Sequence, residues 1–167
     1  MDNPTSDESV LLASDPLEVV EHVLAAENLE FDRTDDGELA FNLAGDWREY
    51  ELWFAWRPEG DCLQLYLSLN FDVTPEQKAA AFELMALVNP RVWLGHFEMW
   101  NDGEIVFRHG IVLSVGEQPS LAQTAAMIDV AMEAADRFYP AFEFLVNGSK
   151  APQEAVAACM FETMGEA

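Results

Sequence analysis

The chain of 167 residues carries 31 Asp and Glu against 8 Lys and Arg, which gives a formal net charge of −23. Because half of its residues are hydrophobic, the composition indicates a folded acidic domain and not a disordered acidic tail. The charge argues strongly against nucleic acid as a partner, since phosphate binding needs a basic surface, and against an anionic membrane surface. The length fits one domain with its own core.

Residues 1–13 are polar and acidic and predict a flexible N-terminal tail, followed by a single domain over residues 14–164. The first residues lack the basic and apolar regions of a secretory signal, and no apolar run approaches the roughly 18 residues of a membrane span. The two cysteines, Cys62 and Cys159, make neither a disulfide framework nor a zinc pair. We therefore expect a soluble cytoplasmic protein with reduced thiols.

The first half of the domain predicts a helix and then a run of strands. The helix begins at Ser14 or Asp15, has Pro16 in its first turn and ends near Asn28. The block that follows alternates apolar and polar residues between short turns, which is typical of an antiparallel meander. We expect at most a short strand over Leu29–Arg33, and strands over Glu38–Leu43, Tyr50–Arg57 and Leu63–Phe71.

The second half begins with another helix and a hairpin. The start of this helix is indicated by Thr74-Pro75-Glu76-Gln77, which combines a cap, a first-turn proline and a capping-box glutamine. The helix is expected to end at Asn89-Pro90. The hairpin strands are expected over Val92–Trp100 and Glu104–Leu113.

A long amphipathic helix follows, starting at the capping box of Ser120 and Gln123 and ending at Asn147-Gly148. Pro140 is expected to kink this helix or divide it in two. A last helix is expected over Pro152–Met164. The apolar stripe of the long helix is predicted at Leu121, Ala125, Ile128, Met132, Ala135, Tyr139, Phe142 and Val146.

The two histidines of the hairpin are its most chemical feature. If Asp102-Gly103 is a two-residue turn, His96 lies directly opposite His109, and Glu98 is nearby. Two opposed imidazoles could share a metal ion, which defines an alternative function as a metal- or small-ligand-binding domain. Because metal sites normally need three or four ligands, a structural role for the histidines is favoured, and neither metal nor cofactor is predicted.

Motifs of catalysis are not found in the sequence: it has no nucleophile elbow, phosphate loop or dinucleotide-binding glycine motif. Carboxylates are so frequent that a pair in some cleft is expected by chance, so paired-acid catalysis cannot be inferred. We predict that the protein is not an enzyme and name no catalytic residue.

The five tryptophans all fall in or beside predicted strands, so some of them face outward if the strands alternate. An outward aromatic sheet face would be a protein-binding or dimer surface. The alternative is that helices cover this face. The tryptophans are Trp47, Trp53, Trp56, Trp93 and Trp100.

Half of the acidic residues, 15 of 31, lie within residues 1–51. Three interpretations remain open. The acids form a solvated face that serves solubility, they reflect salt adaptation, as the presence of just two lysines suggests, or they form a docking surface for a basic partner segment.

Residues Trp93–Met99 contain Gly-His-Phe-Glu, and Glu104–Leu113 contain Phe-Arg-His; both segments resemble the YbjN family. Asp136–Pro140, and Gly148 with Pro152–Ala155, resemble the C-terminal part of that family. The order and spacing of these segments make the resemblance fairly specific.

The resemblance covers about residues 15–163, with Gly110 in place of the more usual alanine and with Trp93 and Trp100 as departures. It implies an α+β fold similar to type III secretion chaperones, with the order α-β-β-β-α-β-β-α around an antiparallel sheet. Our reading of the chain adds a C-terminal helix to that order. The candidate family-motif or partner-binding residues are Gly95, His96, Phe97, Glu98, Arg108, His109, Tyr139 and Pro140.

The resemblance also implies a function in the regulation of sensory transduction. Chaperones of the similar fold are small acidic homodimers that bind extended segments of other proteins. We therefore predict a non-enzymatic cytoplasmic protein-binding domain, chaperone-like or regulatory, that forms a homodimer. Its partner would be another protein or an extended basic or amphipathic segment, reached through apolar sheet or helix surface and an acidic face.

Overall fold

The computed structural model describes residues 15–164, so the tail predicted over residues 1–13 lies outside the described part of the chain. The first helix, α1 (Pro16–Ala26), begins where the sequence predicts it. The Asp15 carboxylate accepts a hydrogen bond of 3.0 Å from the Leu17 backbone N–H and satisfies one of the donors left open at the helix start.

The strands form one antiparallel sheet in the order β1-β2-β3-β4-β6-β5. The first four strands are a meander, and the segment with the second helix carries the chain to the far edge of the sheet. At three residues, β1 is the short strand that the sequence suggests. The strands are β1 (Phe31–Arg33), β2 (Leu39–Ala44), β3 (Glu49–Arg57), β4 (Cys62–Asp72), β5 (His96–Met99) and β6 (Glu104–Val112).

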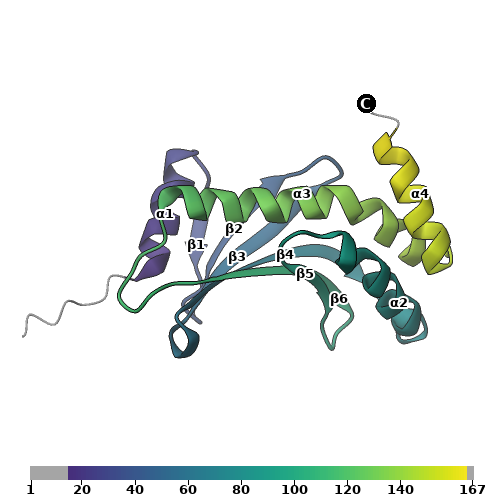
Figure 1. The fold of residues 1–167 in the computed structure, drawn as a ribbon, viewed down its shortest axis with the longest axis horizontal. Helices are drawn as coiled ribbons and strands as arrows, with labels where there is room; N and C mark the ends of the chain where they lie inside the picture. Colours follow the sequence, from purple (N-terminus) through teal and green to yellow (C-terminus); the bar gives the residue numbers. More distant parts are fainter. Residues whose placement is uncertain (1–14, 165–167) are drawn as a thin grey trace, which may run out of the picture.

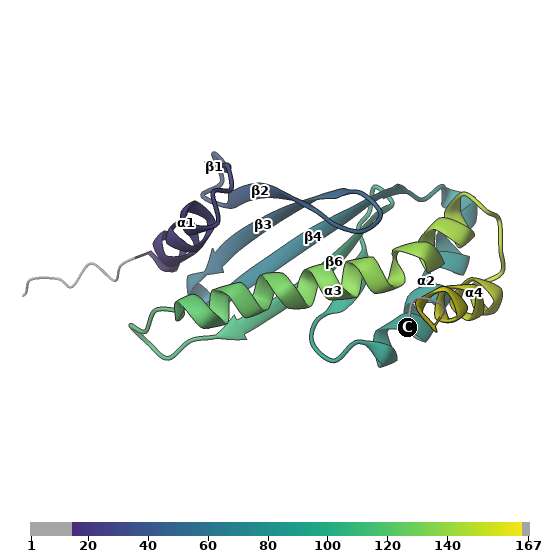
Figure 2. The ribbon, with the colours of Figure 1, turned by 90° about the horizontal axis from the view of Figure 1, so that it is seen from above.

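The helices lie on one face of the sheet and at one end of it (Figure 1). The long helix α3 (Leu121–Val146) contacts β4 and β6, and α1 packs against α3 and β3. At the other end of the molecule, α2 (Lys78–Val88) and α4 (Pro152–Met164) pack against each other and against α3 (Figure 2). The structure confirms the single α+β domain, the antiparallel sheet and the additional C-terminal helix.

The core fills the space between the sheet and these helices. Along β4 the odd-numbered positions from Leu63 to Phe71 point toward the helices and are buried. Phe97 of β5 meets Phe107 of β6 edge-to-face at 5.2 Å between ring centroids, and Phe138 and Phe142 of α3 lie 6.1 and 5.1 Å from Phe97. Each such side chain stabilises the fold by roughly 1.5–3 kcal/mol relative to an exposed position.

The ends of α3 follow the sequence signals closely. The Ser120 hydroxyl accepts a 3.0 Å hydrogen bond from the Gln123 N–H, and the Gln123 side chain accepts one of 2.8 Å from the Ser120 N–H. Pro140 does not divide the helix. Figure 2 shows that α3 changes direction in its C-terminal part, which contains Pro140. Because proline has no backbone N–H, the helix lacks one hydrogen bond at this position.

The buried face of α3 is rotated relative to the predicted stripe. Leu121 is exposed and Met132 is half-buried, whereas Ala131 and Ala134 are buried. The prediction followed large side chains, but alanines make up much of the face that packs on the sheet. The buried positions are Thr124, Met127, Ile128, Ala131, Ala134, Ala135, Phe138, Pro140, Ala141, Phe142 and Leu145.

The predicted register of the hairpin is wrong by one residue. The Gly103 N–H donates to the Trp100 carbonyl and the Trp100 N–H donates to the Glu104 carbonyl, both at 2.9 Å, so the loop has three residues. Its last residue, Gly103, has a φ of +92°, as in hairpins that end in a left-handed bulge residue. As a result His96 pairs with Arg108, and His109 points to the other face of the sheet.

A single carboxylate attaches the β2–β3 loop to α3. The Asp136 Oδ1 accepts hydrogen bonds from the Asp46 N–H at 3.0 Å and from the Tyr50 hydroxyl at 2.9 Å. The Asp136 carbonyl accepts one from the Trp47 indole at 2.8 Å. Burial, together with this hydrogen bond to Asp136, raises the pKa of Tyr50 above its usual range. A Cβ atom on Gly45 would lie 2.3 Å from the Tyr50 ring and 2.5 Å from the Asp136 carboxylate.

Gly45→Ala is expected to lower the free energy of unfolding by about 2 kcal/mol, because the new methyl group overpacks the contact between the loop and α3. Gly60→Ala is the matched control, since a Cβ there meets nothing closer than 4.0 Å, and should change stability by less than about 0.5 kcal/mol. Urea unfolding followed by tryptophan fluorescence measures both. Equal stability of the two variants would contradict the close contact at Gly45.

Candidate functional site

Within residues 15–164 no helix packs on one face of the sheet, and this face carries two of the five tryptophans. Trp53 and Trp100 form a small cluster there with strand residues alone, apart from the main core. Trp56, by contrast, packs against the main core on the helix-covered face. The two alternatives predicted for the aromatic strands are thus divided between the faces: helices cover one set of rings and leave the other open.

The open rings form a compact group, which we call the aromatic cluster: Trp53, Tyr66 and Trp100. Trp53 and Tyr66 are cross-strand partners and stack with ring centroids 5.3 Å apart. Trp100 meets them edge-on, with centroids 5.7 Å from Trp53 and 6.1 Å from Tyr66. These are favourable aromatic geometries, and they leave no space between the rings for a ligand. Only 6% of Tyr66 is exposed, although none of the described helices covers it.

Glu98 connects the aromatic cluster to the charges of β5 and β6. Its carboxylate accepts hydrogen bonds from the Trp100 indole at 2.9 Å and from the His96 ring at 3.0 Å, and pairs with Arg108 at 3.3 Å. Burial would raise the pKa of Glu98, but these hydrogen bonds and the charge of Arg108 outweigh it and lower the pKa. The carboxylate therefore stays ionised and positions Trp100.

Beside the aromatic cluster, the same face has an acidic groove of about 470 Å³ between β1, β2 and β3. It is continuous with the cluster, because Ala40 in the groove is the cross-strand partner of Trp53. None of the described residues that line it is basic. The acidic groove is lined by Asn28, Leu29, Glu30, Phe31, Asp32, Ala40, Phe41, Asn42, Glu49 and Glu51.

Both edges of the sheet are poorly suited to pairing with another strand. At the β5 edge, the Asn89 side chain donates to the Phe97 carbonyl at 3.0 Å and accepts from the Phe97 N–H at 2.8 Å. The amide thus occupies the positions that an added strand would use. At the other edge β1 has three residues, and its Arg33 is held by Asp15 and Glu21 of the α1 region. The face, and not the edge, is therefore the available surface.

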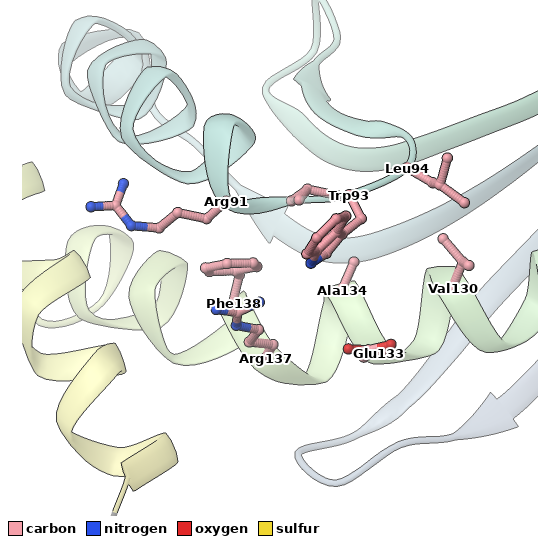
Figure 3. Close-up of a pocket in the computed structure, with 9 residues that line it drawn as sticks. Arg91, Trp93, Leu94, Val130, Glu133, Ala134, Arg137 and Phe138 are labelled. Atoms are coloured by element: carbon pink, nitrogen blue, oxygen red, sulfur yellow. The ribbon is translucent and has the colours of Figure 1, made fainter.

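A second exposed apolar feature lies on the helix side of the sheet, in the loop before β5 (Figure 3). Trp93 is 94% exposed and Leu94 is 52% exposed. They line a cavity of about 60 Å³ together with Val130, Ala134 and Phe138 of α3.

The family model described as "putative bacterial sensory transduction regulator", named YbjN, matches residues 16–144. The chain belongs to the YbjN family. A crystal structure of YbjN from E. coli, described as "a putative transcription regulator", is similar with a TM-score of 0.53 and 11% sequence identity. The match covers 72% of this chain and 85% of that chain, and at this identity it shows the common fold alone. No curated protein matches the sequence.

The YbjN-like segments contribute to two different parts of the structure. His96, Glu98 and Arg108 lie together on the helix-free face, as described above. Tyr139 and Pro140 lie on α3, where Tyr139 stacks on Phe71 at 5.0 Å between ring centroids. The predicted site residues therefore do not form one site.

The remaining residues of these segments have structural positions. Phe97 and His109 are buried, and Phe97 belongs to the main core. Gly95 has a φ of +75°, and a Cβ on it would lie 2.5 Å from the Phe107 ring and 2.7 Å from the Arg108 carbonyl. A glycine is thus needed where the chain enters β5.

The metal alternative fails on the hairpin register, because His96 and His109 project from opposite faces of the sheet. Over the described part of the chain, no group of three or more His, Cys, Asp and Glu side chains could hold a metal ion. The three-residue loop is the physical reason, since one additional loop residue moves every cross-strand partner by one position and places His109 on the opposite face of the sheet from His96.

No helix of residues 15–164 is long and apolar enough to cross a membrane.

The acidic groove and the role of Tyr66 were not predicted from the sequence. Trp53 and Tyr66 alternate with the buried leucines of β3 and β4, which places both rings on the face opposite the core. This alternation is a sequence signal that could have predicted the pair. The groove depends on the pairing of three strands, which the local pattern of acids does not specify.

Glu98→Gln is expected to lower the free energy of unfolding by about 0.5–1 kcal/mol at pH 7, since Glu98 is a partly exposed ionic partner. Because the folded state lowers the pKa of Glu98, its stabilising effect is complete above its unfolded pKa of about 4.3 and disappears as the pH falls through the folded value. The stability difference from wild type should thus shrink between pH 7 and about pH 3. Urea unfolding across this range, with Glu117→Gln as an exposed control, measures it.

His109 is expected to make the protein less stable in mild acid. Burial lowers its pKa, so the unfolded state takes up a proton near pH 6.5 before the folded state does. Stability from this group is therefore present above about pH 6.5 and lost as the pH falls toward the lowered folded value. His109→Gln should flatten the decrease between about pH 7.5 and 5.5 in urea unfolding. An unchanged slope would contradict a buried neutral imidazole, and His22→Gln provides the comparison from an exposed position.

Proposed function

We propose that this chain is a regulatory protein-binding domain that acts without catalysis and uses the helix-free face of its sheet to bind a basic segment of another protein. The observation that carries the proposal is the aromatic cluster of Trp53, Tyr66 and Trp100 beside the acidic groove. One feature offers apolar contact and the other offers negative charge, and both lie on one continuous face.

The aromatic cluster suits the role of an anchor for a partner. Tryptophan and tyrosine are enriched among the residues that carry most of the binding energy in protein interfaces. The rings are fixed by contact with each other and by the hydrogen bond from the Trp100 indole to Glu98. A partner therefore meets a rigid surface and loses little affinity to its ordering.

The charges of the face favour a basic partner. Glu30, Asp32, Glu49 and Glu51 line the groove, and no described basic residue lies among them. Arg57 of β3 and Arg108 of β6 are each paired, at 3.2 Å with Glu38 and at 3.3 Å with Glu98. Carboxylates of this kind steer a positively charged partner and increase its association rate.

Binding without catalysis agrees with the state of the titratable groups. The lowered pKa of Glu98 makes it a weak base, and its oxygens are already engaged by three donors. His109 is buried on the other face of the sheet. The proposal places the protein in the cytoplasm, where cysteine thiols stay reduced.

The proposal is tested by capture from a lysate of the source cells, with wild-type protein and variants immobilised side by side. A true partner is retained by wild type and by the control Phe82→Ala, which changes an exposed ring on α2. It is lost with Trp53→Ala. For the purified partner, Trp53→Ala should weaken the affinity about thirtyfold, as expected of a residue at the centre of an interface.

The charge contribution has its own variant. Glu49→Gln combined with Glu51→Gln should lower the association rate severalfold, and binding of the wild type should weaken as salt rises. The measurements are stopped-flow fluorescence and calorimetry at 50 and 500 mM salt, between which the Debye length falls about threefold. Unchanged rates in the double variant would assign the acids to solubility. Equal retention of every protein by Trp53→Ala would overturn the proposal.

A further inference from the structure

Trp93 and Leu94 are neighbours in sequence, and both leave most of their surface in water. A contiguous exposed apolar surface of this kind marks a contact site more often than scattered single side chains do. The position is separate from the aromatic cluster, because Val130, Ala134 and Phe138 of α3 stand behind it on the helix side of the sheet. We call this surface the Trp93 ledge: Arg91, Trp93, Leu94, Val130, Glu133 and Arg137.

The loop that carries the Trp93 ledge is held at both ends. At its start, the Val92 N–H donates to the Asn89 carbonyl at 3.1 Å, and the Asn89 side chain makes both of its hydrogen bonds to Phe97. At its end, Gly95 makes a turn with a φ of +75° that leaves no room for a side chain. The backbone that carries Trp93 is therefore held in place, which reduces the backbone entropy lost when the side chain is covered.

The occupant follows from the charge of the ledge. Two copies of a chain with a net charge of −23 repel each other, so self-contact is favoured where carboxylates are sparse. The ledge carries Arg91 and Arg137, two of the eight basic residues of the chain, against one acid, Glu133. In a two-fold contact each arginine can approach the Glu133 of the other copy, so the surface is complementary to itself.

A small molecule is a poorer occupant. The cavity behind Trp93 has a volume of about 60 Å³, well below the roughly 300–1,000 Å³ of small-molecule and cofactor sites. We therefore expect a macromolecular partner to contact the exposed side chains of the ledge, Trp93 and Leu94. Arg137 adds to this surface, since its guanidinium lies 5.0 Å from the centre of the Phe138 ring.

We propose that two copies of this chain associate through their Trp93 ledges, with the exposed Trp93 and Leu94 side chains of each copy packed against the ledge of the other. Because the ledge lies on the helix side of the sheet, the dimer leaves both aromatic clusters and both acidic grooves uncovered. A dimeric regulator then offers two binding faces, and a partner with two basic segments gains affinity from both.

Sedimentation velocity and light scattering over a concentration series test the dimer. We expect Trp93→Ala to raise the dimer dissociation constant at least tenfold, and Arg137→Glu to raise it as well through repulsion with Glu133. Val115→Ala, which changes an 87% exposed side chain in the β6–α3 loop, is the matched control and should dimerise as wild type does. A wild-type protein that stays monomeric at high concentration, or a Trp93→Ala variant that dimerises like wild type, would overturn the proposal.

Salt separates this contact from the binding proposed for the sheet face. Screening reduces the repulsion between two copies, so dimerisation should strengthen between 50 and 500 mM salt, while binding of a basic segment weakens (the Debye length falls severalfold over this range). The monomeric Trp93→Ala variant should still bind one basic partner segment through Trp53. Weaker dimerisation at high salt would count against the Trp93 ledge, independently of the result for the sheet face.

Discussion

The one-sided packing of helices on the sheet determines the rest of the structure. Alternate side chains of the central strands are large and apolar, and α3 and α1 cover that set alone. A six-stranded sheet has two faces, and the helices of the described residues cover one of them. The other face must remain folded in water, which it does by stacking Trp53 on Tyr66 and by holding Trp100 through an ionised carboxylate. Its rings are therefore held in place without a helix over them.

The attachment of α3 to the sheet depends on more than apolar contact. Asp136 accepts two hydrogen bonds through one oxygen and a third through its carbonyl, and so fixes the β2–β3 loop against the helix. This loop precedes β3, the strand that carries Trp53 and the groove residues Glu49 and Glu51. The contact of α3 with this loop thus helps to position the β3 side chains that project from the opposite face of the sheet.

Much of the fold could be predicted from local sequence signals because those signals are strong here. The capping boxes at Ser120 and at Thr74, the proline at the start of α1 and the alternation of β4 each specify one element and one direction of side chains. The hairpin register was mispredicted, since Asn101-Asp102-Gly103 can close as a two- or three-residue loop and sequence alone does not decide between them. The candidate metal pair His96 and His109 depended wholly on that choice.

The candidate surfaces were harder to predict because they depend on contacts between distant segments. Trp53 and Trp100 are far apart in sequence and meet because β3, β4, β6 and β5 are neighbours in that order. The acidic groove likewise needs β1 beside β2 and β2 beside β3. Trp93 is different, since its exposure comes from a loop held at Asn89 and Gly95, a local cause. The net charge of −23 thus enters both proposals in different ways: the groove gathers acids that suit a basic segment, and the ledge with two arginines is where two acidic copies would repel each other least.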